Sequence, residues 1–308
     1  EAETLLREAL AIDRKALGPY HPGLAADLNN LAVALFEKGS LDEAEALLRE
    51  VVAVHRKVLG PGHPDVATGV NDLANVLYLK GRLADAESLY REALAIHREA
   101  LGNDHPSVAQ DLNNLGNALH AGERLEEAES LHREALAIDL AALGDFHPTV
   151  AIDRNNLASV LMDRGRPDEA EPLYRSALAI NRKVLGEHPP GVAINMTHIA
   201  EVLLLRGRPA EAAAQLSPIE EFPLDMLPAD HRARVGARSL LGACLTAQKK
   251  YAEAEEVLLE AFAVQSRPGM GSRAPAKTRQ RILDNYRAWG RADAAAAFEK
   301  SHPLPARS

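Results

Sequence analysis

The chain has 308 residues, of which 46% are hydrophobic but only 4% are aromatic, so a core must be built mainly from aliphatic side chains. The net charge of −9, with acidic and basic residues interspersed, argues against a nucleic-acid partner, which requires clustered Lys and Arg. No apolar run approaches the roughly 18 residues that cross a bilayer, and Cys244 is the only cysteine, so we expect no membrane partner and a reducing, cytoplasmic setting.

Three short motifs recur along the chain at a step of 42 residues. The Glu-Ala-Glu motif begins at Glu1, Glu43, Glu127, Glu169 and Glu253. The Leu-Gly motif begins at Leu17, Leu59, Leu101, Leu143 and Leu185, and the His-Pro motif at His21, His63, His105 and His147. A strict period over this many copies means that one supersecondary unit is repeated, and that each copy buries its apolar face against its neighbours.

Each repeat is predicted to form two helices. The first helix starts at the His-Pro step, because proline is favourable at the first helical position. It ends at a glycine that can take a positive φ, at Gly39, Gly81, Gly165 and Gly207. The second helix opens near Leu41 or Pro167 and stops at Leu59-Gly60. Small residues recur where two helices must cross closely, at Ala32, Ala74, Gly116, Ala158, Ala200 and Gly242.

These small-residue positions, together with the series Ala93, Ala135, Ala177 and Ala261, resemble the tetratricopeptide repeat pattern. The 42-residue length, the run from Glu43 to Gly60, the His63-Pro64 step and the segment Leu112-Asn113-Asn114-Leu115 resemble the kinesin light chain variety, which bacteria use in multidomain signalling proteins. The resemblance implies an all-α fold, a right-handed superhelical solenoid of antiparallel helix pairs. It covers roughly residues 1–266 and is specific for fold rather than for function.

The repeat register predicts the limits of each unit. Residues 1–17 are predicted to be the second helix of a truncated repeat, followed by four regular repeats at 18–59, 60–101, 102–143 and 144–185. A degenerate fifth repeat covers 186–229, a sixth 230–266, a C-terminal helix pair 273–300 and a tail 301–308. Pro218, Pro223 and Pro228 interrupt the fifth repeat, so a shortened helix and an irregular link are expected over 217–229. Residues 267–272 are predicted to be a loop.

The predicted helix of residues 1–17 lacks the first helix of its own repeat. Its apolar face (Leu6, Ala9 and Leu10) is expected to be uncovered, whereas solenoids normally cap their ends with a polar face. We therefore expect more repeats or another domain upstream, and we keep open the alternative that the repeat simply starts there. Self-association through this helix is a further hypothesis about partners.

A series of asparagines on the first helices is the candidate binding surface. In this repeat family the first helices line the concave face of the superhelix. One position holds Asn29, Asn71, Asn113 and Asn155, the next holds Asn30, Asn114 and Asn156 with Asp72 among them, and one turn on lie Asn75 and Asn117. A carboxamide offers one acceptor and two donors, which match a peptide bond, so such a ladder could hold an extended chain by its backbone. The resemblance to kinesin light chains assigns cargo-peptide binding to Asn29, Asn71, Asn113 and Asn155.

The same asparagines have a structural alternative. They could bond between neighbouring first helices and only brace the array, an interpretation that we favour for the series of Asn30, Asn114 and Asn156. Further along these helices, Tyr78 and His120 could form side-chain pockets beside the ladder, or could pack between repeats. Scattered acids, among them Asp72 and Glu201, favour a basic or neutral peptide.

No catalytic chemistry, metal or cofactor is expected. The histidines of the His-Pro motif occur once per repeat, about 8–10 Å apart for packed helices, which is too far to share a metal, so they are interpreted as helix-start residues. His55 and His97 share a register position with Asp13, Asp139 and Asn181, which is interpreted as a solvated face. Cys244 is interpreted as a buried, inert thiol.

The sequence therefore predicts a non-enzymatic protein–protein interaction scaffold that binds an extended peptide through the asparagine ladder. The alternative is a regulatory or substrate-recruiting repeat region of a bacterial signalling enzyme whose catalytic domain lies upstream. The segment from Asp284 to Gly290 favours that alternative, because it resembles the close of repeat arrays attached to bacterial serine/threonine kinases.

Overall fold

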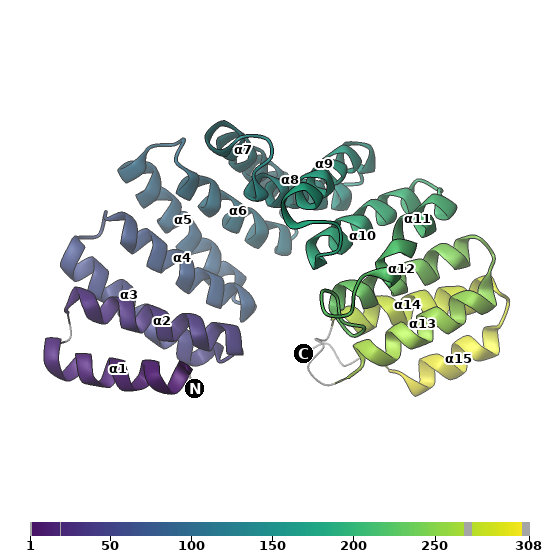
Figure 1. The fold of residues 1–308 in the computed structure, drawn as a ribbon, viewed down its shortest axis with the longest axis horizontal. Helices are drawn as coiled ribbons and strands as arrows, with labels where there is room; N and C mark the ends of the chain where they lie inside the picture. Colours follow the sequence, from purple (N-terminus) through teal and green to yellow (C-terminus); the bar gives the residue numbers. More distant parts are fainter. Residues whose placement is uncertain (1, 19, 268–272, 304–308) are drawn as a thin grey trace. The chain divides into compact units, whose positions relative to one another are not determined.

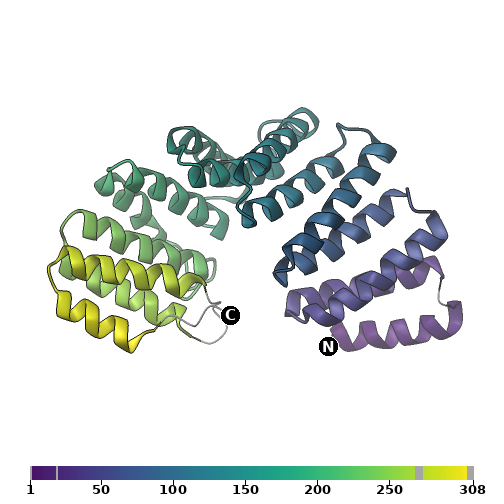
Figure 2. The same ribbon diagram turned by 180° about the vertical axis from the view of Figure 1, so that it is seen from behind.

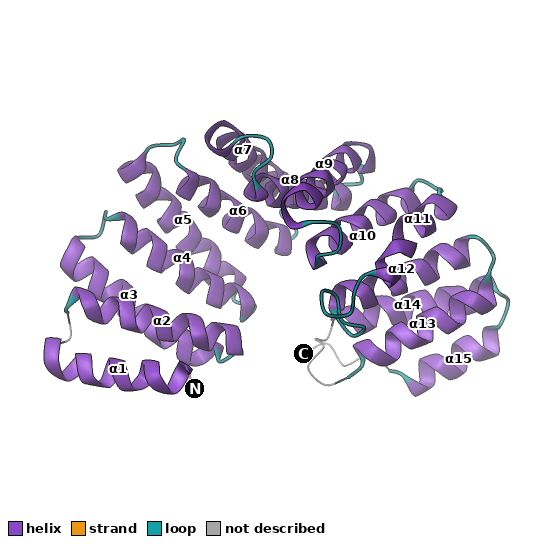
Figure 3. Ribbon diagram, in the orientation of Figure 1, coloured by secondary structure: helices purple, strands orange, loops and turns teal. Residues whose placement is uncertain are grey.

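The computed structural model describes residues 2–18, 20–267 and 273–303, and these residues form helices joined by turns, without a strand (Figure 3). Consecutive helices pack side by side in antiparallel pairs over residues 2–143 and again over residues 167–301, as seen from both sides in Figures 1 and 2. The predicted all-α architecture of helix pairs is confirmed. The chain divides into two compact units, Glu1–Val160 and Leu161–Ser308, and α8 runs through the division.

The N-terminal unit begins with α1 (Ala2–Leu17) and continues through three helix pairs. These are α2 (Pro22–Lys38) with α3 (Leu41–Leu59), α4 (Pro64–Leu79) with α5 (Leu83–Leu101), and α6 (Pro106–Ala121) with α7 (Leu125–Leu143). Most of α8 (Pro148–Asp163) follows. The even-numbered helices are the first helices of the repeats.

The C-terminal unit contains the end of α8 and seven further α-helices among its described residues. They are α9 (Pro167–Leu185), α10 (Pro190–Leu205), α11 (Pro209–Leu216), α12 (Arg232–Ala247), α13 (Tyr251–Gln265), α14 (Arg273–Ala288) and α15 (Ala292–Ser301). A 3-10 helix, Ser217–Glu221, follows α11 directly. The limits of the repeats themselves stay predictions, and the predicted loop and tail fall in part on residues 268–272 and 304–308, outside the described residues.

The histidines of the His-Pro motif cap the first helices. Nδ1 of His63 accepts a hydrogen bond from the backbone N–H of Asp65 at 3.2 Å, and Nδ1 of His105 accepts one from Ser107 at 3.1 Å. The same bond is made by His21, His147 and, without a following proline, His231. Each bond satisfies a backbone donor that a helix start leaves free, so the interpretation as helix-start residues is confirmed.

The core of the N-terminal unit is aliphatic. Leu24, Leu28, Leu31 and Leu35 of α2 are at most 2% exposed, and their spacing of three or four residues places them on one face of the helix. Each such side chain contributes roughly 1.5–3 kcal/mol when it is removed from water. The alanines at the crossing positions, such as Ala32 and Ala74, are buried as well, which allows the helices to approach closely.

The apolar face of α1 is covered at Leu6 and Leu10, contrary to expectation, whereas Ala9 is exposed as expected. Leu10 is only 5% exposed, and Leu6 packs against the same core cluster as Leu28 and Leu31 of α2. The expectation was wrong for Leu6 and Leu10 because α2, although it belongs to the next repeat, covers them. Self-association through α1 stays a prediction.

Arg234 organises the segment between α11 and α12. This side chain is 2% exposed and donates to three backbone carbonyls, those of Glu220 at 2.8 Å, Phe222 at 2.6 Å and Leu227 at 2.8 Å. A buried guanidinium can replace the helical hydrogen bonds that this proline-interrupted segment lacks. Nothing in the repeat register marks Arg234 for this role, so the sequence alone does not predict it.

Candidate functional site

The candidate asparagines all lie on the first helices of the N-terminal unit, which can be followed in Figure 1. Helix α2 carries Asn29 and Asn30, α4 carries Asn71 and Asn75, α6 carries Asn113, Asn114 and Asn117, and α8 carries Asn155 and Asn156. Their surroundings differ strongly from one repeat to the next. The structure separates them into amides that are bonded inside the array and amides that are open.

Asn71 is bonded inside the array. It is 5% exposed, its Nδ2 donates to Oδ1 of Asp111, and its Oδ1 accepts from Nδ2 of Asn114 at 2.9 Å. Oδ2 of the same Asp111 lies 2.6 Å from Nδ1 of His97. The four side chains form a polar layer between α4, α5 and α6, and both ends of the Asn71 carboxamide are used within it.

Asn113 is bonded in the same way one repeat later. It is 8% exposed, its Nδ2 donates to Oδ1 of Asp153 at 2.6 Å, and its Oδ1 lies 2.9 Å from Nδ1 of His132. Burial lowers the pKa of His132 to about 4, so the ring is neutral near pH 7 and can donate through Nδ1. These contacts support bracing rather than ligand binding for Asn71 and Asn113.

The position shared by Asp13, His55, His97, Asp139 and Asn181 is not a solvated face, so that interpretation was wrong. His97 is 4% exposed and Asp139 is 2% exposed. His97, Asp139 and Asn181, each on a second helix, meet a residue fourteen positions later, on the first helix of the next repeat. His97 meets Asp111, Asp139 meets Asp153, and Asn181 donates to Asn195 at 2.7 Å. The sequence signal for these pairs is a polar residue at each of two register positions that lie fourteen residues apart.

Three amides are open. Asn29, Asn75 and Asn117 are half-buried, and no protein partner occupies Asn29 or Asn117 among the described residues. Asn75 accepts one hydrogen bond at Oδ1, from the hydroxyl of Tyr90 at 2.7 Å, and its Nδ2 remains available. Asn75 and Asn117 occupy the same register position on α4 and α6, which contact each other.

The remaining predicted residues are divided between packing and surface. Asn30 is exposed, whereas Asn114, Asn155 and Asn156 are half-buried. Tyr78 packs against the aliphatic core, and His120 is half-buried near His132. The structure therefore does not bring all of the predicted residues onto one open surface.

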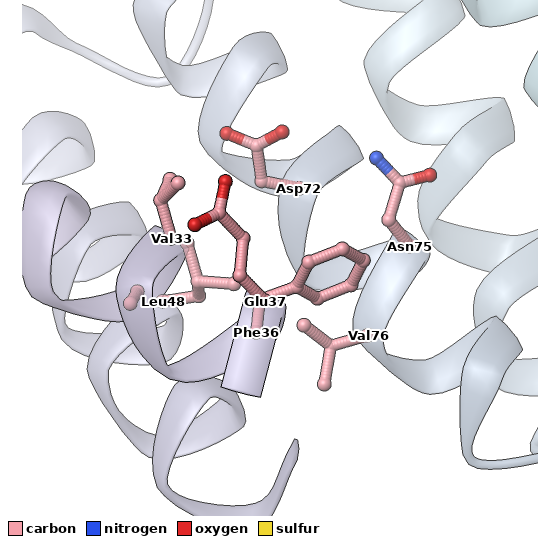
Figure 4. Close-up of a pocket in the computed structure, with 8 residues that line it drawn as sticks. Val33, Phe36, Glu37, Leu48, Asp72, Asn75 and Val76 are labelled. Atoms are coloured by element: carbon pink, nitrogen blue, oxygen red, sulfur yellow. The ribbon is translucent and has the colours of Figure 1, made fainter. Parts of the chain in front are cut away.

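Two cavities adjoin Asp72 at the junction between α2 and α4. One has a volume of about 280 Å³ and is formed by Val33, Phe36 and Glu37 of α2 with Asp72, Asn75 and Val76 of α4, together with Ala32 and Leu48 (Figure 4). The other has a volume of about 240 Å³ and includes Asn29, His55 and Gly69. Burial raises the pKa of Asp72 to about 6. No hydrogen-bond partner engages Asp72 among the described residues, although in the sequence it is only one of several scattered acids.

No three His, Cys, Asp or Glu side chains come together as metal ligands in the described part of the chain. Cys244 is buried, as predicted, and burial raises the pKa of its thiol to about 11, which disfavours the reactive thiolate. The helices that the structure describes are too short or too polar for any of them to cross a membrane.

Comparison with known proteins agrees with this geometry. Models described as "Tetratricopeptide repeat" match residues 25–65, 65–141 and 148–217, whereas no curated protein matches the chain. A structure of a Podosopora anserina protein assigned as a kinesin light chain, with nearly identical TPR-like repeats, has 25% identity and a TM-score of 0.59 over 66% of this chain and 96% of its own.

Two further solved structures share the fold. BtubC (BKLC) from P. vanneervenii has 23% identity and a TM-score of 0.63, over 71% of this chain and 89% of its own. The apo form of the quorum sensor NprR from B. thuringiensis has 14% identity and a TM-score of 0.72, over 97% of this chain and 81% of its own. With the period of 42 residues, the helix pairs and the family matches in agreement, the chain belongs to the tetratricopeptide repeat family, and its structural neighbours include kinesin light chain-like repeat proteins.

Proposed function

We propose that this chain is a non-catalytic scaffold that binds an extended segment of another protein along the first helices of its N-terminal unit. The open amides of Asn29, Asn75 and Asn117 contact the backbone of that segment. Asn71 and Asn113 hold the repeats together beneath it. The observation that carries this proposal is the free hydrogen-bonding capacity of Asn75 and Asn117 at the same register position of neighbouring first helices.

The spacing of these amides suits an extended peptide. Packed helices such as α4 and α6 lie about 8–10 Å apart, and an extended chain advances about 3.4 Å per residue. One amide per repeat can therefore meet about every third residue of the ligand. An asparagine in the middle of a helix lowers the stability of the helix by about half a kcal/mol relative to alanine, so each open amide is kept at a small cost in stability. Backbone contacts of this kind give affinity with little dependence on the ligand's sequence.

The test is selection of peptides from a random display library, followed by affinity measurements with two paired variants. Asn75→Ala with Asn117→Ala should weaken binding of the selected peptides about tenfold or more, because two ligand hydrogen bonds of about 1 kcal/mol each are lost. That variant should stay folded, with a modestly lower thermal midpoint, because the buried Tyr90 hydroxyl loses its acceptor at Asn75. Peptides N-methylated at single backbone nitrogens should lose affinity at specific positions.

The matched control is Asn71→Ala with Asn113→Ala. These changes remove internal hydrogen bonds to Asp111 and Asp153, so we expect a lower thermal midpoint and little direct effect on ligand contacts. If the folded Asn75/Asn117 variant binds selected peptides as tightly as the wild type, the open amides are not the binding groups. If the library yields no binder at all, the scaffold function itself is contradicted for this surface.

A further inference from the structure

The junction between α2 and α4 differs from the next junction in one respect that creates space. In the junction between α4 and α6, Asn71, Asn114 and Asp111 form a closed hydrogen-bonded set. The same three register positions in the earlier junction hold Asn29, Asp72 and Gly69. Gly69 has no carboxylate to engage Asn29. The amide of Asn29 and the carboxylate of Asp72 are therefore left without partners among the described residues.

The second helix shows the same opening. His97 of α5 is bonded to Asp111, whereas its counterpart His55 of α3 has no carboxylate at Gly69 and instead lies with Nδ1 3.1 Å from the backbone oxygen of Asp65. Gly69 lines the cavity of about 240 Å³ that Asn29 and Asp72 also line. Asp72 also lines the neighbouring cavity of about 280 Å³, so the two cavities flank one half-buried carboxylate.

The lining of the two cavities selects the charge of an occupant. Their carboxylates are Glu37, Asp65 and Asp72, and neither Lys nor Arg lines either cavity. The only imidazole among the lining residues is His55. Beside Asp72 lie the carboxylate of Glu37 and the apolar side chains of Val33 and Phe36, all from α2 (Figure 4). A half-buried carboxylate without a partner is stabilised by a cation, and an aliphatic stem suits the apolar wall.

We propose that this junction, defined by Asn29, Gly69 and Asp72, is a specificity pocket that takes a lysine or arginine side chain of the bound peptide. The ammonium or guanidinium group pairs with Asp72, the stem packs on Val33 and Phe36, and Asn29 contacts the adjoining backbone. The proposal rests on the peptide-binding function above. It adds the residue preference that the backbone contacts alone do not supply.

The test uses the same random peptide library, selected in parallel on the wild type and on Asp72→Asn. The wild type should enrich Lys or Arg at one fixed position of the selected peptides, and Asp72→Asn should lose that enrichment. A selected peptide should bind the Asp72→Asn variant about tenfold more weakly than it binds the wild type. An analogue of that peptide in which Met replaces the enriched Lys should bind the wild type about tenfold more weakly than the original peptide does. Asp104→Asn, an exposed change of equal charge outside both cavities, should leave affinity and enrichment unchanged.

A second variant closes the pocket instead of removing its charge. Gly69→Asp with Asp72→Asn copies the residues of the closed junction, and the new carboxylate would lie near His55 as Asp111 lies near His97. This variant should keep its helical circular dichroism and lose the preference for Lys or Arg. A wild-type selection with binders but no basic position would overturn the pocket, and so would unchanged affinity in Asp72→Asn. If either of these outcomes were found and the Asn75→Ala/Asn117→Ala variant still lost binding, only the pocket would be contradicted, and the proposed scaffold function would still be supported.

Discussion

His97 and Asp111 form a buried hydrogen-bonded pair between α5 and α6, with Nδ1 and Oδ2 2.6 Å apart and both side chains at most 5% exposed. Burial raises the pKa of the Asp111 carboxyl, and the bond to His97 opposes that shift. The pair joins the second helix of one repeat to the first helix of the next. Corresponding pairs occur at other junctions, so this polar contact is a repeated feature of the array.

Asp111→Ala should destabilise the N-terminal unit strongly. The change removes the hydrogen-bond partner of two buried polar atoms, Nδ1 of His97 and Nδ2 of Asn71. We expect a loss of about 2–4 kcal/mol in the free energy of unfolding, because buried polar groups that lose their partners retain their desolvation cost. Urea unfolding measures this loss. The exposed Asp104→Ala is the control, and a change in Asp111→Ala as small as that of the control would contradict a structural role for the pair.

The carboxyl pair of Asp139 and Asp153 should make stability depend on pH. Burial raises the pKa of Asp153 to about 7, and the neighbouring Asp139 carboxylate contributes to the rise. Burial also raises the pKa of Asp139. Since these folded-state values lie above the unfolded value of about 4, the folded protein binds more protons, and its stability falls as the pH rises from about 4 through about 7.

Replacing both carboxyls of this pair by amides, Asp139→Asn with Asp153→Asn, should remove the dependence. The C-terminal unit already uses two asparagines at the equivalent junction, where Nδ2 of Asn181 donates to Oδ1 of Asn195 at 2.7 Å. We expect the urea midpoints of the double variant to differ less between about pH 5 and about pH 8 than those of the wild type. An identical pH dependence in the two proteins would show that the pair does not hold a proton in the folded state.

The sequence predicts the helices much better than it predicts the candidate site. The His-Pro steps and the glycines mark helix ends because they act locally, through a cap or a positive φ such as that of Gly39 (+83°). The state of an asparagine is decided elsewhere in the chain. Asn71 is closed because Asp111 lies on the next first helix, whereas Asn29 is open because Gly69 occupies that position. Matching polar residues at one register position therefore do not share one environment.

The histidine caps lead to a prediction about helix starts. His105→Ala removes the acceptor of the Ser107 backbone N–H and should cost about 1 kcal/mol, the usual value of an N-cap. His105→Asp should retain most of the stability, since aspartate is a good N-cap and favours the positive end of the helix dipole. Urea unfolding of the two variants distinguishes a cap from a residue of no structural consequence. Equal stability of His105→Ala and the wild type would rule out the cap.

Gly242 of α12 marks a crossing where even a methyl group does not fit. A Cβ atom there would lie 2.6 Å from Cδ2 of the fully buried Leu258, so Gly242→Ala should destabilise the C-terminal unit by about 1–3 kcal/mol through overpacking. Gly236, on the same helix, is the matched control, because a Cβ atom there meets nothing within 4 Å. Gly236→Ala should instead stabilise the helix by about 0.5–1 kcal/mol, since alanine has the higher helix propensity. Opposite shifts of the urea midpoint would show that contact with Leu258 sets the residue at position 242, and stabilisation by both changes would show that the crossing has room for alanine.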